Sequence, residues 1–162
     1  MLSPFEFLLK KLMETEIAMS RLYHHFSVRF PEAADFWKQM SRDEVEHSKW
    51  IGEALEMLRT GEMSRGITTL TSQAADMVIK HVDSICAKAR GGEISLLSAY
   101  ATAYDLENSL LEKKFFSALD LDLPPYKEVR DKLVRATQAH RKKIGEALSA
   151  IRSREKVSSV LA

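Results

Sequence analysis

The chain has 162 residues, 45% of them hydrophobic, which is enough for one compact domain with a sizeable core and short for two. Its 24 basic and 23 acidic side chains nearly cancel, and no basic block is interleaved with aromatic residues. This excludes the usual composition of a nucleic-acid-binding protein. Cys86 is the only cysteine, which excludes an internal disulfide and a Cys-x-x-Cys metal site.

The N-terminal stretch Met1–Glu6 lacks the basic start and long apolar core of a secretory signal. No apolar run reaches the length of a membrane span. A single cysteine also fits a reducing compartment. We therefore expect a cytoplasmic protein without membrane contacts.

Segments with apolar residues at helical spacing fill most of the chain, and the six glycines and four prolines fall mainly between them. Ser3-Pro4 is typical of a helix start, and no run of alternating β-branched residues suggests a strand. The sequence predicts a single all-α domain over residues 1–162, with a frayed end after 152. The expected helices are at about 4–29, 32–60, 69–89, 92–120 and 125–152.

The expected helices pair into two hairpins. Pro31 separates the first two helices, and Pro124-Pro125 precede the last one. The segment at 69–89 is shorter and more polar than the others, so we expect it to return the chain to the other end. The prediction is a four-helix bundle of two antiparallel hairpins with a long helical crossover.

Four of the apolar stripes contain a carboxylate or an imidazole. Glu44 and His47 lie three residues apart in the stripe of the second helix, so they share one face. Glu16, Glu107 and His140 occupy the same kind of position in the first, fourth and last helices. Because an unpaired charge is costly in a core, these groups need a common partner. Glu-x-x-His pointing inward is how helical bundles hold iron or manganese.

The depth of these residues along the bundle supports one shared site. Glu16 and Glu44 are each about 14 residues, or roughly 20 Å, from the proline turn between their helices. Glu107 and Thr137 are each about 15 residues from the double-proline turn, and His140 lies one turn further on. Each pair therefore meets at one level, and the two hairpins read as a diverged internal repeat.

The motifs resemble the ferritin-like superfamily, most closely its rubrerythrin-type di-iron domain, over nearly the whole chain. The residues that carry the resemblance are Glu16-x6-Tyr23, Glu44-x-x-His47, Glu107 and His140. It implies a ferritin-like bundle in which Glu16 and Glu107 are outer carboxylates and Glu44 bridges two metals. His47 and His140 would be the imidazole ligands. It also implies that Tyr23 takes part in catalysis as the hydrogen-bond donor that orients a carboxylate.

Two departures from the family pattern stand out. The last helix, expected at about 125–152, has Thr137-Gln138-Ala139-His140 where the family repeats Glu-x-x-His. A threonine therefore takes the place of the second bridging carboxylate. With three carboxylates against two divalent ions, excess positive charge weakens binding of the second metal. We expect one or two iron ions, with manganese or zinc suited to the same donors. A rubredoxin-like cysteine module is also missing, so electrons would come from a separate donor or from solution.

Family members reduce peroxide, activate oxygen, or oxidise and store iron. The resemblance therefore implies a metal-binding, rubrerythrin-like oxidoreductase, and the architecture favours a homodimer. The alternative is a non-catalytic bundle that stores or senses metal, or a scaffold with a degenerate site. In that scaffold Glu44, His47, Glu107 and His140 would form a buried hydrogen-bonded cluster without metal.

Overall fold

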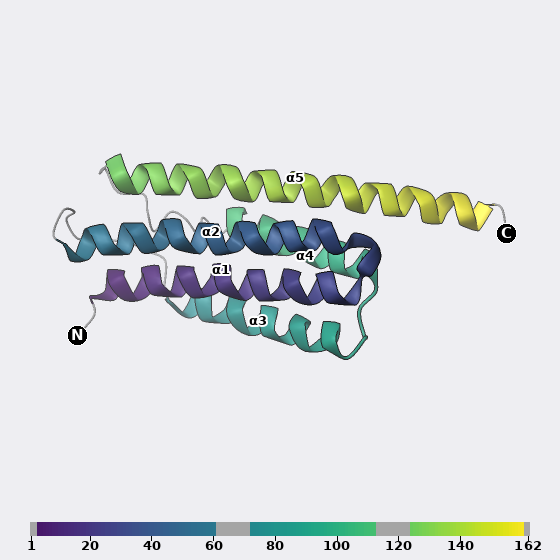
Figure 1. The fold of residues 1–162 in the computed structure, drawn as a ribbon, viewed down its shortest axis with the longest axis horizontal. Helices are drawn as coiled ribbons and strands as arrows, with labels where there is room; N and C mark the ends of the chain where they lie inside the picture. The colour runs from purple at the N-terminus through teal and green to yellow at the C-terminus, as the bar shows by residue number, and fades with distance from the viewer. Residues whose placement is uncertain (1–2, 61–71, 113–123, 161–162) are drawn as a thin grey trace.

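The computed structural model describes residues 3–60, 72–112 and 124–160. These ranges contain helices and no strand, which confirms the all-α prediction for the part of the chain described (Figure 1). The elements are α1 (Pro4–Arg29), the short 3-10 helix η1 (Pro31–Ala33), α2 (Ala34–Arg59), α3 (Ser72–Arg90), α4 (Leu96–Glu112) and α5 (Pro124–Val160).

The helices lie side by side along one long axis (Figure 1). α1 and α2 form an antiparallel hairpin, and α3 packs along the other side of α1. α3 carries the chain back to the η1 end, from which α4 starts; α4 and α5 form a second antiparallel pair. Contacts between α2 and α5 join the two pairs, so residues on α1, α2, α4 and α5 can face a common interior.

Local sequence explains where α1 and α4 begin. The side chain of Ser3 accepts a hydrogen bond from the Glu6 N–H at 3.2 Å, and the Glu6 carboxylate accepts one from the Ser3 N–H at 2.7 Å. This reciprocal cap satisfies two N–H groups that the first turn leaves free. At α4, the Ser95 side chain accepts from the Ser98 N–H at 3.1 Å. α4 therefore starts at Leu96 and not at 92, after a turn in which Gly92 takes a φ of 73°.

α5 is longer than the sequence suggested. The prediction of a helix that ends near residue 152 and is followed by a frayed tail was wrong. α5 continues to Val160 and projects past the end of the other helices (Figure 1). No glycine or proline follows Gly145, so nothing in the backbone chemistry stops the helix. The predicted ends at 69–71 and 113–120 lie outside the described residues.

The register of α1 against α2 is fixed by a pair of serines. The Ser20 hydroxyl donates to the Ser41 carbonyl at 2.9 Å, and the Ser41 hydroxyl donates to the Ser20 carbonyl at 2.9 Å. Small side chains at this crossing let the two backbones approach closely. Ser20 lies one turn beyond Glu16 and Ser41 one turn before Glu44, so this register places the two carboxylates opposite each other.

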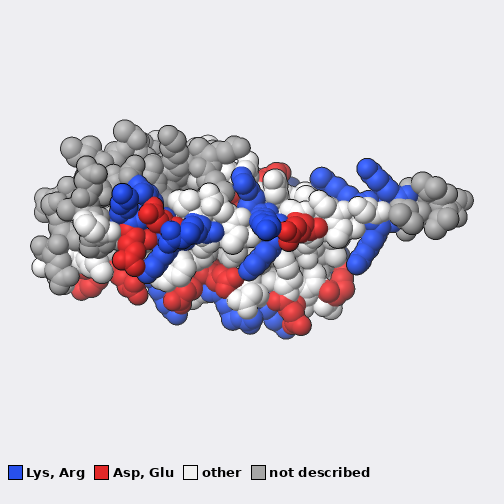
Figure 2. Space-filling model, turned by 90° about the horizontal axis from the view of Figure 1, so that it is seen from above, with Lys and Arg blue, Asp and Glu red and all other residues white. Residues whose placement is uncertain are grey.

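The surface carries charges of both signs. On the face above α5, Lys and Arg side chains lie beside Asp and Glu side chains (Figure 2). Ion pairs such as Lys132 with Glu128, at 3.1 Å, contribute to this pattern. No helix among the described residues has an apolar stretch long enough to cross a bilayer.

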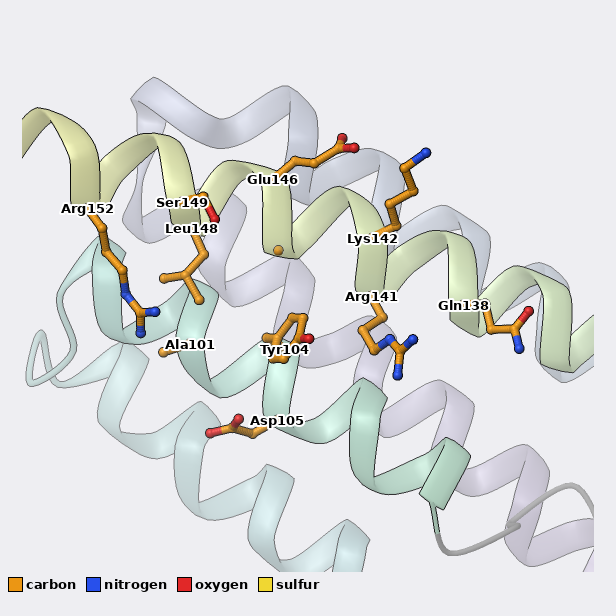
Figure 3. Close-up of a pocket in the computed structure, with 11 residues that line it drawn as sticks. Ala101, Tyr104, Asp105, Gln138, Arg141, Lys142, Glu146, Leu148, Ser149 and Arg152 are labelled. Atoms are coloured by element: carbon orange, nitrogen blue, oxygen red, sulfur yellow. The ribbon is translucent and has the colours of Figure 1, made fainter.

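A groove of about 1100 Å³ runs between α4 and α5 (Figure 3). Tyr104 and Asp105 line it from α4, and Arg141, Lys142 and Arg152 line it from α5. Arg141 is anchored there by a hydrogen bond to Asn108 at 2.9 Å. None of the inward carboxylates or imidazoles lines this groove.

Candidate metal centre

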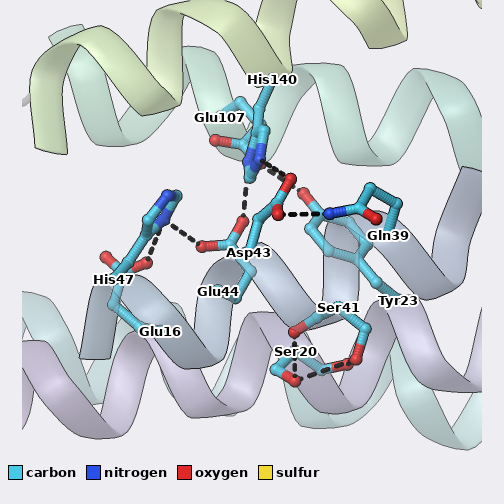
Figure 4. A network of polar contacts seen from close by, with 10 residues as sticks. All are labelled: Glu16, Ser20, Tyr23, Gln39, Ser41, Asp43, Glu44, His47, Glu107 and His140. Atoms are coloured by element: carbon cyan, nitrogen blue, oxygen red, sulfur yellow. Dashed lines mark hydrogen bonds and ion pairs between the residues drawn. The ribbon is translucent and has the colours of Figure 1, made fainter. Parts of the chain in front are cut away.

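The five residues predicted as metal ligands come together in the interior (Figure 4). α1, α2, α4 and α5 contribute to this cluster, and α3 does not. Each side chain is at most 3% exposed. The cluster, named here the Glu/His cluster, consists of Glu16, Glu44, His47, Glu107 and His140.

Glu44 lies at the centre and contacts both imidazoles. Its Oε2 is 2.8 Å from Nδ1 of His47, and its Oε1 is 3.0 Å from Nδ1 of His140. Each Nδ1 also faces an outer carboxylate, since Glu16 Oε2 is 3.4 Å from His47 and Glu107 Oε1 is 3.4 Å from His140. The cluster therefore has two half-sites of the same composition, and Glu44 is shared between them.

The donor set suits a transition-metal ion. Glu44, His47 and His140 each offer one ligand atom, and these atoms all lie within 4.8 Å of one another. Oxygen and imidazole donors together suit iron, manganese and zinc. In addition, the buried Oε1 of Glu16 has no hydrogen-bond partner among the described residues. A buried carboxylate oxygen without a partner is costly, and a cation would satisfy it.

Tyr23 contacts the cluster from α1. Its hydroxyl donates a hydrogen bond of 2.6 Å to Oε1 of Glu107, across 84 residues of sequence. The contact joins the two helix pairs and restrains the Glu107 side chain, as expected of a residue that orients a carboxylate. Tyr23 is fully buried, so this hydrogen bond is shielded from water.

Asp43 is a site residue that the sequence analysis missed. Its Oδ2 lies 3.2 Å from Nε2 of His140, and its Oδ1 accepts a hydrogen bond of 2.6 Å from the Gln39 amide. With Nε2 held on the outer side, His140 presents Nδ1 to Glu44. Asp43 is off the apolar stripe and its side chain is 28% exposed. Its position next to Glu44 in the sequence could have suggested it, because consecutive helix residues are about 100° apart and Asp43 therefore flanks the apolar stripe.

Thr137 lies where the internal repeat would place a fourth carboxylate. It is 2% exposed and sits one turn before His140 on α5. A hydroxyl at this position adds no negative charge to the interior. The two half-sites therefore depend on Glu44 as their only shared carboxylate, as the sequence indicated.

The carboxylates and imidazoles shift one another's pKa values. Burial alone would lower the pKa of both imidazoles, but hydrogen bonds to the carboxylates raise it to about 10 for His47 and about 11 for His140. Burial raises the pKa of Glu16 well above its usual range and that of Glu107 to about 7, and the negative charge of Glu44 adds to both effects. Burial also opposes ionisation of Glu44, yet its hydrogen bonds with His140 and His47 hold its pKa well below the usual range.

These shifts predict how the stability of the metal-free protein depends on pH. Above pH 6.5 the folded imidazoles keep protons that the unfolded chain loses, so each contributes stability that disappears as pH rises toward 10 or 11. The slope is about 1.4 kcal/mol per pH unit for each such proton. Glu44 acts oppositely, because its stabilisation is lost as the solution becomes acidic. The free energy of unfolding should therefore be greatest at mildly acidic pH.

Urea denaturation of chelator-treated protein across neutral and alkaline pH would measure this profile. Replacing His140 by glutamine should make the alkaline decline less steep, because one of the two titrating imidazoles is gone. A free energy of unfolding that is constant from neutral pH to the alkaline limit would contradict the assigned protonation states.

Comparisons with known proteins found no match. No protein-family model, no curated protein and no solved structure matches this chain. The case for a function therefore rests on the residues and geometry of the Glu/His cluster.

Proposed function

We propose that the protein binds one or two transition-metal ions, iron or manganese, at the Glu/His cluster; zinc suits the same donors. The observation that carries the proposal is the pair of matched half-sites joined by Glu44, each combining one Nδ1 with oxygens of two carboxylates. The unpartnered Oε1 of Glu16 is the second support. Without a bound cation, that oxygen stays buried without a hydrogen-bond partner, which lowers the stability of the fold.

We further propose a ferritin-like, rubrerythrin-type oxidoreductase that reduces peroxide or dioxygen. Iron or manganese in this site would supply one-electron redox chemistry and Lewis acidity. The protein's own residues hold the donors in place: Asp43 fixes the His140 ring, and Tyr23 fixes Glu107. Because the cluster is at most 3% exposed, only small reactants such as peroxide or dioxygen fit the proposal.

A second candidate is a bundle in which the cluster has only a structural role. The contacts between Glu44 and both imidazoles favour it, since protonated imidazoles can partly neutralise the carboxylates without any metal. Thr137 also favours it, because the interior has one carboxylate fewer than two divalent ions require. In this reading the protein is a scaffold with a degenerate site.

Metal content separates the two candidates. Protein purified without chelator should contain one or two iron or manganese ions per chain by plasma mass spectrometry, and stripped protein should take up ferrous iron anaerobically. Binding near neutral pH should release more than two protons. Both imidazoles must lose a proton to coordinate through Nδ1, and the carboxyl groups of Glu16 and Glu107, whose pKa values are raised, must lose theirs as well. Calorimetry in buffers of different ionisation enthalpy would count these protons.

Peroxide consumption by the loaded protein tests the redox part of the proposal. If the metal-loaded protein consumes neither peroxide nor dioxygen in the presence of a reductant, the oxidoreductase proposal fails and a role in metal storage or sensing remains. Protein that neither contains metal nor takes it up would establish the scaffold reading instead.

A further inference from the structure

The depth of the Glu/His cluster raises the question of how electrons reach it. Side chains that are at most 3% exposed cannot touch a protein donor or a bulky reductant. The sequence also contains no cysteine module that could hold a second redox centre. If the cluster holds a redox metal, electrons have to cross the protein through its own side chains.

A row of aromatic rings leads away from the cluster. Tyr23, whose hydroxyl contacts Glu107, stacks on Trp37 with ring centroids 5.6 Å apart and planes inclined by 26°. Trp37 in turn lies against Tyr100, with centroids 4.5 Å apart. Tyr100 is on the second turn of α4, at the η1 end of the bundle, and is 5% exposed. Besides the thiolate of cysteine, tyrosine and tryptophan are the side chains that lose one electron most readily.

The surroundings of Trp37 suit an electron carrier. The indole is fully buried, and the rings of Phe26 and Phe36 pack edge-on against it at 5.0 and 4.9 Å. Its Nε1–H has no acceptor among the residues the structure describes. Among the described residues, no base lies beside this indole to take its proton when it loses an electron. It stays a radical cation, which is a stronger oxidant than the neutral radical and takes an electron back readily.

Tyr23 differs from Trp37 in this respect. A phenol gives up an electron easily only when its proton can leave at the same time. The 2.6 Å hydrogen bond to Glu107 provides the acceptor, so the proton can move to Oε1 as an electron leaves the phenol ring. Trp37 can therefore carry an electron while it keeps its proton, whereas Tyr23 can carry an electron by passing its proton to Glu107.

We propose that Tyr100, Trp37 and Tyr23 form an electron-transfer path from the η1 end of the bundle to the Glu107 half-site. This inference rests on the proposed redox function. Each time the oxidant at the cluster takes one electron from Tyr23, the tyrosine proton passes to Glu107. Peroxide needs two such electrons and dioxygen four, each with one proton from solvent, to be reduced to water. Trp37 returns an electron to Tyr23, which recovers the proton, and Tyr100 returns one to Trp37. An external one-electron donor then reduces Tyr100, which regains from solvent the proton it released there.

Flash photolysis of the metal-free protein tests the path directly. The chain has two tryptophans, so a Trp50→Phe background makes Trp37 the only indole. A flash at a wavelength that indole absorbs and phenol does not ejects an electron, which a cobalt(III) ammine complex in the buffer consumes. The absorption of the indole radical cation should be replaced by that of a phenoxyl radical, as the electron moves from tyrosine to Trp37.

The four tyrosines supply matched variants. In the Trp50→Phe background, Tyr23→Phe combined with Tyr100→Phe should eliminate the phenoxyl signal and prolong the life of the indole radical. Tyr104→Phe combined with Tyr126→Phe should leave the signal unchanged, because neither ring contacts Trp37 in the described part of the chain. Circular dichroism of each variant verifies that it is folded.

A phenoxyl signal that survives removal of Tyr23 and Tyr100, or no conversion of the indole radical in the background protein, would overturn the proposed path. The result is independent of metal, whereas the proposed function fails only if the protein takes up no metal or the loaded protein is inactive. The two failures are therefore distinguishable.

Discussion

Replacing Glu44 by alanine should abolish metal binding at both half-sites. Within the described ranges, Glu44 is the one carboxylate that faces both imidazoles, through Oε2 to His47 and Oε1 to His140. Its loss removes a ligand from each half-site and one negative charge from the interior. The metal content per chain, measured by plasma mass spectrometry after purification without chelator, should fall to background.

The metal-free Glu44→Ala protein should also be less stable. Each imidazole loses one of the two carboxylates that raise its pKa, and removing one partner of a buried charge pair costs about 3–5 kcal/mol. Urea denaturation near pH 6 would measure this loss. Because the imidazoles can respond by losing their protons, the destabilisation should shrink as pH rises.

Two variants control this experiment. Glu53→Ala removes an exposed carboxylate from the same helix and should keep the metal and the stability of the wild type. Glu44→Gln keeps the shape and a hydrogen-bonding oxygen, so it should fold even if the alanine variant does not, and still lose the metal. Retention of stoichiometric metal by folded Glu44→Gln would show that ions bind elsewhere.

The inward-facing residues were predictable because helical periodicity and distance from a turn together define position in a bundle. Glu16 and Glu44 are equally far from the turn that joins α1 to α2, and they do lie at one level in the structure. The same argument placed Glu107 level with Thr137 and one turn from His140, and in the structure Glu107 contacts His140 at 3.4 Å. A carboxylate inside an apolar stripe is therefore a much better indicator of an inward-facing residue than a carboxylate considered without its neighbours.

Other features depend on packing between helices, which the sequence does not display. Asp43 lies off the apolar stripe of its own helix, yet α5 brings His140 to within 3.2 Å of it. The ring contacts of Trp37 with Tyr23 and Tyr100 likewise join three helices, α1, α2 and α4. Each residue alone reads as an ordinary core aromatic. The length of α5 was missed for the opposite reason, since polar residues without breakers are compatible with both a helix and a frayed end.

Restoring the missing carboxylate by Thr137→Glu should raise the metal content from about one ion per chain toward two. Thr137 is buried one turn before His140, at the point where the first hairpin has Glu44. A carboxylate there would complete Glu-x-x-His on α5 and supply the negative charge that a second divalent ion needs in a low-dielectric interior. Plasma mass spectrometry and anaerobic titration with ferrous iron would both report the stoichiometry.

The metal-free Thr137→Glu protein should be destabilised by about 1–3 kcal/mol, because a larger side chain has to fit into a packed interior. Saturating metal should recover more stability in this variant than in the wild type, since ions that bind only the folded state stabilise it. Thr137→Gln is the matched control: it adds the same bulk without the charge, so it should lose stability and gain no metal. If Thr137→Glu also gains none while remaining folded, charge is not what limits the second half-site, and the reading of this chain as a weakened two-metal centre fails.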